Sequence, residues 1–210
     1  MRKRDLQDCG LNGHPGGAEH TRKLVDAAAL PPETRILDLG AGDGSSVKLL
    51  RSLGYQAEGL DLAPRFPDRQ PTEDSPPFSP EREALSPFVR QGNFLATEYP
   101  DESWDAVISE CSFYISGNIS GALAEASRLL KPGGLLLWSD VFFEDPFPLL
   151  DEAGFSVLSL EDETPLWREY YLEALWTGAQ AFCTPKGTCR YLAILAKKCV
   201  SNGRNKHGSL

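Results

Sequence analysis

Residues 36–44 read I-L-D-L-G-A-G-D-G, and this stretch decides the fold of the chain. Apolar residues interrupted by one aspartate lead into a glycine-rich turn, after which residues 45–50 take up the apolar spacing of a helix. Glycines suit such a turn because the backbone bends sharply and a ligand can approach it closely. The pattern predicts a strand, a loop and a helix around a cofactor site. A tight connection that binds nothing is the simpler alternative.

The spacing of the glycines narrows the choice of cofactor. A dinucleotide fingerprint reads G-x-G-x-x-G, but here Ser45 stands at the position of its third glycine. This departure disfavours a nicotinamide-dependent oxidoreductase, which stays open as an alternative. A second strand, predicted over 56–60, places Asp61 at its carboxyl end, 19 residues after Gly42. An acidic residue at this distance accepts hydrogen bonds from ribose hydroxyls in doubly wound sheets.

Composition limits the classes of partner. The 210 residues suit one domain, and 30 acidic against 21 basic residues give a net charge of -9, which disfavours nucleic acid as a partner. The five cysteines are an odd number without a dense disulfide framework, which favours a reducing cytoplasm. No apolar run approaches the ~20 residues that span a bilayer. We therefore expect a cytoplasmic protein that acts on a small molecule and contacts no membrane; the oligomeric state is left open.

The remaining chain alternates between extended and helical patterns. Strands are predicted over 35–39, 56–60, 88–91, 104–109, 135–138, 155–160 and 190–196, and helices over 18–30, 45–53, 120–130, 147–153 and 165–178. We expect a flexible segment at 1–17, one domain over 18–198 and a polar tail at 199–210. Seven prolines between positions 64 and 87 predict an insertion or flap at 63–87, with at most a short helix at 80–85.

Histidines and cysteines are the residues that most often bind metals, but their spacing here predicts no metal site. The sequence holds neither a C-x-x-C pair nor an H-x-x-x-H pair. His14 and His20 flank the start of the first predicted helix, where a histidine beside glycines is either a substrate contact or a solvated side chain.

Five motifs in order carry a resemblance to a known family. They are D-L-G-A-G-D-G at 38–44, the acidic Asp61, G-N-F at 92–94, W-D-A-V-I-S-E at 104–110 and L-K-P-G-G-L-L-L-W-S-D at 130–140. Together they resemble the class I S-adenosylmethionine-dependent methyltransferases (a type 11-like methyltransferase domain) over residues 35–197. The resemblance implies an α/β fold: a Rossmann-like, doubly wound sheet of seven strands in the order 3-2-1-4-5-7-6, with the last strand antiparallel and helices on both faces.

The resemblance also implies S-adenosylmethionine as cofactor and assigns residues to it. Asp38, Gly40, Ala41 and Gly42 would line its methionine part, and Asp61 would hold the ribose. The remaining contacts implied are Leu62, Asn93 and Phe94 near the adenine and Glu110 beside the methyl sulfonium.

Methyl transfer is an in-line displacement on a carbon that the sulfonium already activates, so no fixed catalytic triad is expected. The family places its N-terminal segment and the end of its fourth strand beside the active-site crevice. The catalytic candidates, ranked from Cys111 downward, are therefore Cys111, His14, His20, Glu110 and Tyr114.

A narrower resemblance concerns V-I-S-E-C-S-F-Y-I at 107–115, which is similar to a stretch of arsenite methyltransferases. It implies that Cys111 binds a metalloid, with Cys9 and either Cys183 or Cys189 completing a set of soft thiolate ligands. A small organic acceptor is the preferred hypothesis. A binding module that keeps the fold without catalysis is a further alternative.

Overall fold

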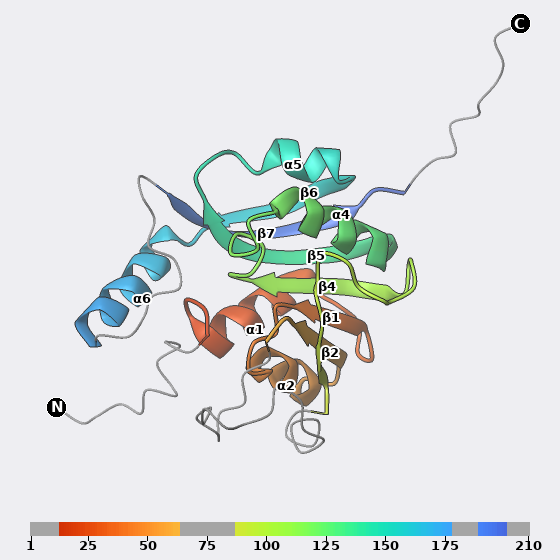
Figure 1. Cartoon of the computed structure of the whole chain (residues 1–210), viewed down its shortest axis with the longest axis horizontal. Helices are drawn as coiled ribbons and strands as arrows, with labels where there is room; N and C mark the ends of the chain where they lie inside the picture. The colour runs from red at the N-terminus through yellow and green to blue at the C-terminus, as the bar shows by residue number, and fades with distance from the viewer. Residues whose placement is uncertain (1–12, 64–86, 178–188, 201–210) are drawn as a thin grey trace, which may run out of the picture.

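The computed structural model describes residues 13–63, 87–177 and 189–200. Its centre is one seven-stranded sheet in the order β3-β2-β1-β4-β5-β7-β6 (Figure 1). The first five strands run parallel to one another, and β7 runs antiparallel to both β5 and β6. The predicted strand order and the orientation of the last strand are confirmed. The strands are β1 Arg35–Leu39, β2 Gln56–Asp61, β3 Val89–Gln91, β4 Trp104–Glu110, β5 Leu130–Phe142, β6 Phe155–Asp162 and β7 Arg190–Lys198.

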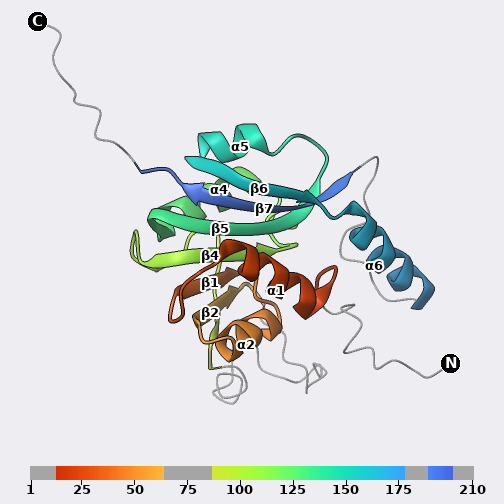
Figure 2. The same ribbon diagram turned by 180° about the vertical axis from the view of Figure 1, so that it is seen from behind.

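Helices cover both faces of this sheet (Figures 1 and 2). One apolar cluster joins α1 (Gly17–Ala28) and α2 (Ser45–Ser52) to the sheet, and a second joins α4 (Ile119–Leu129) and α5 (Phe147–Glu152) to the other face. Along β1, Ile36 belongs to the first cluster and Leu37 to the second, because successive side chains of a strand point to opposite faces. Central parallel strands are therefore apolar on both sides.

The last described helix, α6 (Thr164–Thr177), lies beyond the end of the sheet and extends away from it in both views (Figures 1 and 2). It is held by a small cluster in which Trp167 packs with Val141, Cys189 and Tyr191. None of the helices in the described ranges is both long enough and apolar enough to cross a bilayer.

The fifth strand differs most from its prediction. The sequence K-P-G-G at 131–134 was expected to end a helix ahead of a strand at 135, but β5 already begins at Leu130, which pairs with Trp104. The register between β4 and β5 then shifts before Leu135. Gly133 has φ +77°, and a Cβ on Gly134 would lie 2.9 Å from the carbonyl oxygen of Asp105. The two glycines thus form an irregularity inside a longer strand.

Several predicted features lie outside the described residues. They are most of the segment 63–87 with its expected short helix, residues 1–12, and most of the tail 199–210.

Candidate functional site

The glycine-rich loop between β1 and α2 has the backbone that its sequence predicts. Gly40, Gly42 and Gly44 all have positive φ, at 93°, 55° and 79°. A Cβ on Gly40 would lie 2.1 Å from Oγ of Ser112, whereas a Cβ on Gly42 would meet nothing within 4 Å. The loop therefore packs tightly at Gly40 and leaves open space at Gly42, where a ligand can approach the backbone.

Asp61, at the end of β2, holds this loop in place. One carboxylate oxygen accepts a hydrogen bond from the backbone N–H of Gly42 at 2.9 Å, and the other accepts one from Ala63 at 2.8 Å. Next to it, Leu62 exposes 67 % of its surface. The structure thus brings together the two features, 19 residues apart, from which the sequence predicted a ribose site.

Two buried acids lie on the face of the sheet that α1 and α2 cover. Asp38 lies two residues after Ile36 on β1, and Glu110 lies two residues after Ile108 on β4. Each acid therefore points to the same face of the sheet as that isoleucine. Burial raises the pKa of Asp38 well above its ordinary value, and the nearby charges of Glu110, Asp61 and Asp43 add to this effect. The region behind the glycine loop is therefore acidic and shielded from water.

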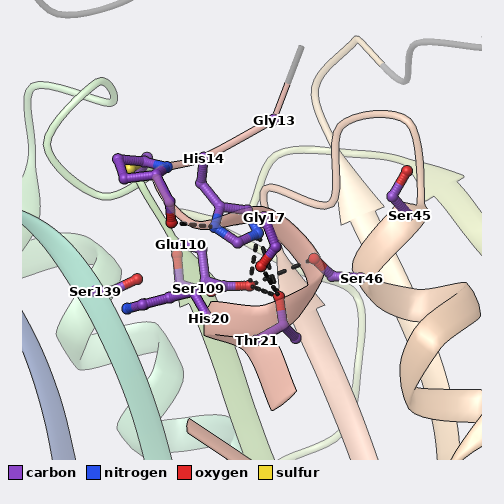
Figure 3. Close-up of polar contacts among 12 residues, drawn as sticks. Gly13, His14, Gly17, His20, Thr21, Ser45, Ser46, Ser109, Glu110 and Ser139 are labelled. Carbon is purple, nitrogen blue, oxygen red and sulfur yellow. Dashed lines mark hydrogen bonds and ion pairs between the residues drawn. The ribbon is translucent and has the colours of Figure 1, made fainter. Parts of the chain in front are cut away.

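Glu110 is the centre of a buried polar cluster that joins β4 to α1 (Figure 3). Its Oε1 lies 2.9 Å from Nδ1 of His20, and its Oε2 lies 3.2 Å from Nε2 of His14. Oε2 also accepts hydrogen bonds from the hydroxyls of Thr21 at 2.8 Å and Ser46 at 3.3 Å. Two of the predicted catalytic candidates, His14 and His20, therefore meet a third, Glu110.

The electrostatics of this cluster favour an ionised Glu110. Burial by itself would raise the pKa of Glu110, but the His14 and His20 rings and the Thr21 hydroxyl outweigh it and hold the pKa below its usual range. His20 is 3 % exposed, and its second ring nitrogen, Nε2, has no hydrogen-bond partner among the described residues.

Cys111 directly follows β4 and has φ +55°, a left-handed conformation that costs a non-glycine residue energy. Its backbone N–H donates to the carbonyl of Ser139, and its Sγ lies 3.5 Å from the hydroxyl of Tyr191. That hydroxyl in turn contacts Oγ of Ser139 at 3.0 Å. Strain of this kind occurs at functional sites more often than elsewhere, so it marks the strand end as a candidate site.

A hollow of about 430 Å³, counted with the space open to solvent, lies beside Cys111. Its wall is largely apolar and aromatic, and is formed by Gly13, Pro15, Cys111, Tyr114, Ile115, Asp140, Val141, Trp167, Tyr170 and Tyr171.

Asp140 fixes one side of this hollow. Its carboxylate accepts hydrogen bonds from the backbone N–H groups of Tyr114 at 2.9 Å and Val141 at 2.8 Å. Burial raises the pKa of Asp140 to about 6, although these hydrogen bonds oppose the shift.

Of the three residues predicted near an adenine, Asn93 and Phe94 lie beyond the end of β3, and Leu62 follows β2. Asn93 is exposed, and its side-chain oxygen accepts a hydrogen bond from the backbone N–H of Leu95. Phe94 packs against the ring of Phe113, with ring centroids 5.7 Å apart. Gly92, just before them, donates its N–H to the carbonyl of Asp61, so this loop borders the end of β2.

Sequence reasoning missed four members of the site: Thr21, Ser46, Asp140 and Tyr191. Only Asp140 had a recognisable signal in the sequence, because it comes shortly after the strand predicted over 135–138, in the W-S-D run at 138–140. The other three lie within helices or a strand, and nothing in their local pattern separates them from ordinary packing residues.

Comparison with known proteins identifies the domain. The sequence pattern of a methyltransferase domain family matches residues 37–138, which include both the glycine loop and the end of β4. Residues 37–138 thus form a methyltransferase domain, on a sheet with the class I, S-adenosylmethionine-dependent fold. YodH of Bacillus subtilis (strain 168), an uncharacterised methyltransferase, is 29 % identical to it over 156 residues, which cover 71 % of this chain and 64 % of that protein. The methyltransferase domain described here thus spans less than two thirds of that relative.

Solved structures share the fold of this methyltransferase domain. The [4+2]-cyclase SpnF has a TM-score of 0.65 and 20 % sequence identity, over 87 % of this chain and 81 % of its own. The geranyl diphosphate C-methyltransferase of Streptomyces coelicolor A3(2), in complex with Mg²⁺, geranyl diphosphate and S-adenosylhomocysteine, has a TM-score of 0.61 and 18 % identity, over 85 % and 78 %. At these identities the likeness concerns the fold alone.

Proposed function

We propose that this domain transfers a methyl group from S-adenosylmethionine to a small-molecule acceptor by in-line displacement. The observation that carries the proposal is the glycine loop, which is open at Gly42, tied to Asp61, and next to buried acids. None of these features of the loop requires a nicotinamide cofactor.

The residues around the loop fit the donor. Gly40, Ala41 and Gly42 offer backbone to its methionine part without side chains in the way, and Asp61 offers carboxylate oxygens to the ribose hydroxyls. Leu62 supplies exposed apolar surface for the adenine, with Asn93 and Phe94 from the neighbouring loop. The cofactor supplies a methyl group that its sulfonium has already activated.

Charge supports the same cofactor. Glu110 and Asp61 lie close enough to Asp38 to raise its pKa further than burial alone does, so the negative charge of this region rests on Glu110 and Asp61. S-adenosylmethionine carries a sulfonium and an ammonium, so an acidic and largely buried site favours it over an uncharged ligand. In this proposal Asp38 acts on the methionine part through the loop, and Glu110 lies near the sulfonium.

The acceptor would occupy the aromatic hollow beside Cys111. Its wall of Tyr114, Trp167 and Tyr171 suits a partly apolar or aromatic molecule and would keep water from the reacting atoms. Cys111 is the first candidate for contact with the acceptor, and Tyr114 the next. If the accepting atom carries a proton, the Glu110 and His14 pair is the candidate to receive it, with His20 orienting the carboxylate.

A metalloid acceptor remains the second candidate from the local sequence resemblance. Cys111 packs against the cluster that contains Cys189, while Cys9 and Cys183 lie outside the described residues. Cys189 is buried beside Trp167, which suits a packing role at least as well as a ligand role.

Calorimetry with S-adenosylmethionine, S-adenosylhomocysteine and NAD tests the cofactor, with Gly42→Ala as the decisive variant. Its added methyl group meets nothing within 4 Å, so the variant should fold at a cost of about 1–2 kcal/mol for the left-handed φ. It should nevertheless lose cofactor affinity, because the methyl group fills the space that the ligand needs. Binding of NAD alone, or unchanged affinity in Gly42→Ala, would contradict the proposal.

The acceptor assignment has a separate test. Cys111→Ser should remove any binding of arsenite if the metalloid hypothesis is right, and should leave cofactor affinity unchanged under either hypothesis. Arsenite binding that survives this substitution rules out a role for Cys111 as a metalloid ligand.

A further inference from the structure

Three side chains in the Glu110 cluster are of the types that bind transition metals. Nε2 of His14, Nδ1 of His20 and the Glu110 carboxylate all offer a ligand atom, and these atoms lie within 4.8 Å of one another. Two imidazole nitrogens and one carboxylate form a known zinc ligand set, in which a tetrahedral ion about 2.1 Å from each ligand separates the ligand atoms by roughly 3.4 Å. The contacts of Glu110 with His20 at 2.9 Å and His14 at 3.2 Å are close to that separation.

A neutral His14 ring has too few protons to donate a hydrogen bond to both of its acceptor neighbours. Its Nδ1 lies 3.2 Å from the carbonyl oxygen of Pro15 and its Nε2 lies 3.2 Å from Oε2 of Glu110, and both of these oxygens can only accept. A neutral ring has one proton, so the nitrogen without it faces an oxygen that is also an acceptor. With that proton at Nδ1, the unmatched pair is Nε2 and Oε2 of Glu110. A cation shared by the two atoms removes this conflict.

The hydroxyl of Thr21 cannot donate a hydrogen bond to both Nε2 of His14 and Oε2 of Glu110. Its hydroxyl has one proton and lies 2.8 Å from Oε2 of Glu110 but 3.2 Å from Nε2 of His14. The shorter and charge-assisted bond to Glu110 takes the proton. Protonating His14 is the alternative way to resolve the conflict, and it makes a buried imidazolium.

The surrounding groups resemble those that support a bound metal. Ligating histidines commonly donate their other ring N–H to a backbone carbonyl, and Nδ1 of His14 lies 3.2 Å from the carbonyl oxygen of Pro15, where a metal-bound ring would donate. Ligating carboxylates are commonly hydrogen-bonded in turn, as Glu110 is to Thr21 and Ser46. In the described part of the chain, the ion-pair partners of Glu110 are the two histidines, so no lysine or arginine there neutralises its charge.

We propose that His14, His20 and Glu110 bind a divalent transition-metal ion, with Zn²⁺ as the probe. The site lies beside the aromatic hollow, because Gly13, Pro15 and Cys111, the neighbours of its ligands in the sequence, line that hollow. Three protein ligands leave the remaining coordination position for a ligand with a lone pair. The metal site does not rest on methyl transfer, since it is measured without cofactor; while the ion is bound, Glu110 and His14 are not available as the proton acceptor considered above.

The test is a calorimetric titration of the 210-residue chain with Zn²⁺ after chelator treatment, at pH 7 and without S-adenosylmethionine. One ion per chain should bind with micromolar affinity or tighter. His14→Ala and Glu110→Gln should each weaken binding by roughly 100-fold, because each removes one of three protein bonds to the ion. His207→Ala removes the third histidine of the sequence, which lies outside the described residues, and should leave the affinity unchanged.

Co²⁺ absorption separates this site from binding by cysteine. The Co²⁺ complex should show the visible bands of a tetrahedral or five-coordinate ion without thiolate charge-transfer absorption, and His14→Ala should abolish those bands. Circular dichroism shows whether each variant is folded, and His14→Ala is the safest of them, since its side chain is 12 % exposed at the edge of the cluster. Absence of one-to-one binding by the wild-type chain, thiolate absorption, or unchanged affinity in folded His14→Ala overturns the proposal. The cluster is then a histidinium–carboxylate ion pair.

Discussion

Two regions at the carboxyl ends of the central strands are built in different ways. The glycine loop region, residues 38–63, is held by backbone groups and by Asp61, whose carboxylate partners lie within 19 residues of it. The Glu110 region gathers side chains from the N-terminal segment, α1, α2 and β4, and the contact of His20 with Glu110 joins residues 90 positions apart. The first region depends on chain geometry, and the second on which side chains the packing brings together.

This difference indicates how each region should respond to substitution. A loop made by backbone tolerates most side-chain changes away from its glycines and its one acidic partner. A buried cluster of side chains loses a hydrogen bond or an ion pair with almost any change, because each polar group there lacks water as a substitute partner.

The largest effect is expected at Asp61. Asp61→Ala removes the acceptor for the N–H groups of Gly42 and Ala63, together with the proposed ribose contacts. Hydrogen bonds to a charged group contribute about 1.5–3 kcal/mol each, so affinity for S-adenosylmethionine should fall by roughly 1000-fold. Isothermal calorimetry measures this loss.

The matched control is Glu58→Ala on the same strand. Glu58 pairs with Arg90 at 3.6 Å on the surface and should leave cofactor affinity unchanged. An Asp61→Ala variant that binds as tightly as the wild-type chain would show that the ribose assignment is wrong.

The second-largest effect expected is the change of folding stability with pH that Asp140 causes. Its folded-state pKa of about 6 is above the ordinary 3.8, so the folded chain binds more protons than the unfolded chain between these values. Stability therefore falls as pH rises through this window, by about 3 kcal/mol for a shift of roughly 2 units. Asp140→Asn has no such group, so the stability of the wild-type chain relative to this variant should fall between pH 4 and pH 7.

Urea unfolding of both chains at several pH values checks this sign. Asp162→Asn provides the opposite control, because hydrogen bonds from Thr164 lower the pKa of Asp162. Relative to that variant, the wild-type chain should lose stability as pH falls. Parallel curves for the wild-type chain and Asp140→Asn would mean that Asp140 is not desolvated as described.

The smallest effect is expected on α6, outside both regions. Trp176 is 89 % exposed, whereas Trp167 on the same helix is 9 % exposed and lines the hollow. Trp176→Ser should change the free energy of unfolding by less than about 0.5 kcal/mol, since tryptophan and serine have similar helix propensities.

Thermal unfolding measures the effect, with Trp167→Ala as the companion variant. Trp167→Ala should lower the free energy of unfolding by about 3 kcal/mol, as truncations of buried aromatic side chains do. Equal losses in the two variants would show that α6 packs by a face other than the one described.

The sequence predicted the order of the strands and the glycine loop correctly, and its errors have local causes. Strand patterns are read from apolar runs, so β5 was predicted to begin at Leu135, where the run begins. Pairing with Trp104 extends it back to Leu130 across two glycines, and only the neighbouring strand reveals this. The domain limits, the adenine contacts and the cytoplasmic location remain predictions.

The sequence by itself determined the methyltransferase fold and predicted the place of its cofactor loop, because glycine spacing, strand period and a nearby aspartate act within short stretches of chain. It also singled out His14, His20, Glu110 and Cys111 one by one. Only the tertiary structure decided that the first three form one buried cluster and that Tyr191 and Asp140 stand beside Cys111. Contacts between remote segments depend on how whole helices and strands pack, and no local pattern in the sequence records that packing.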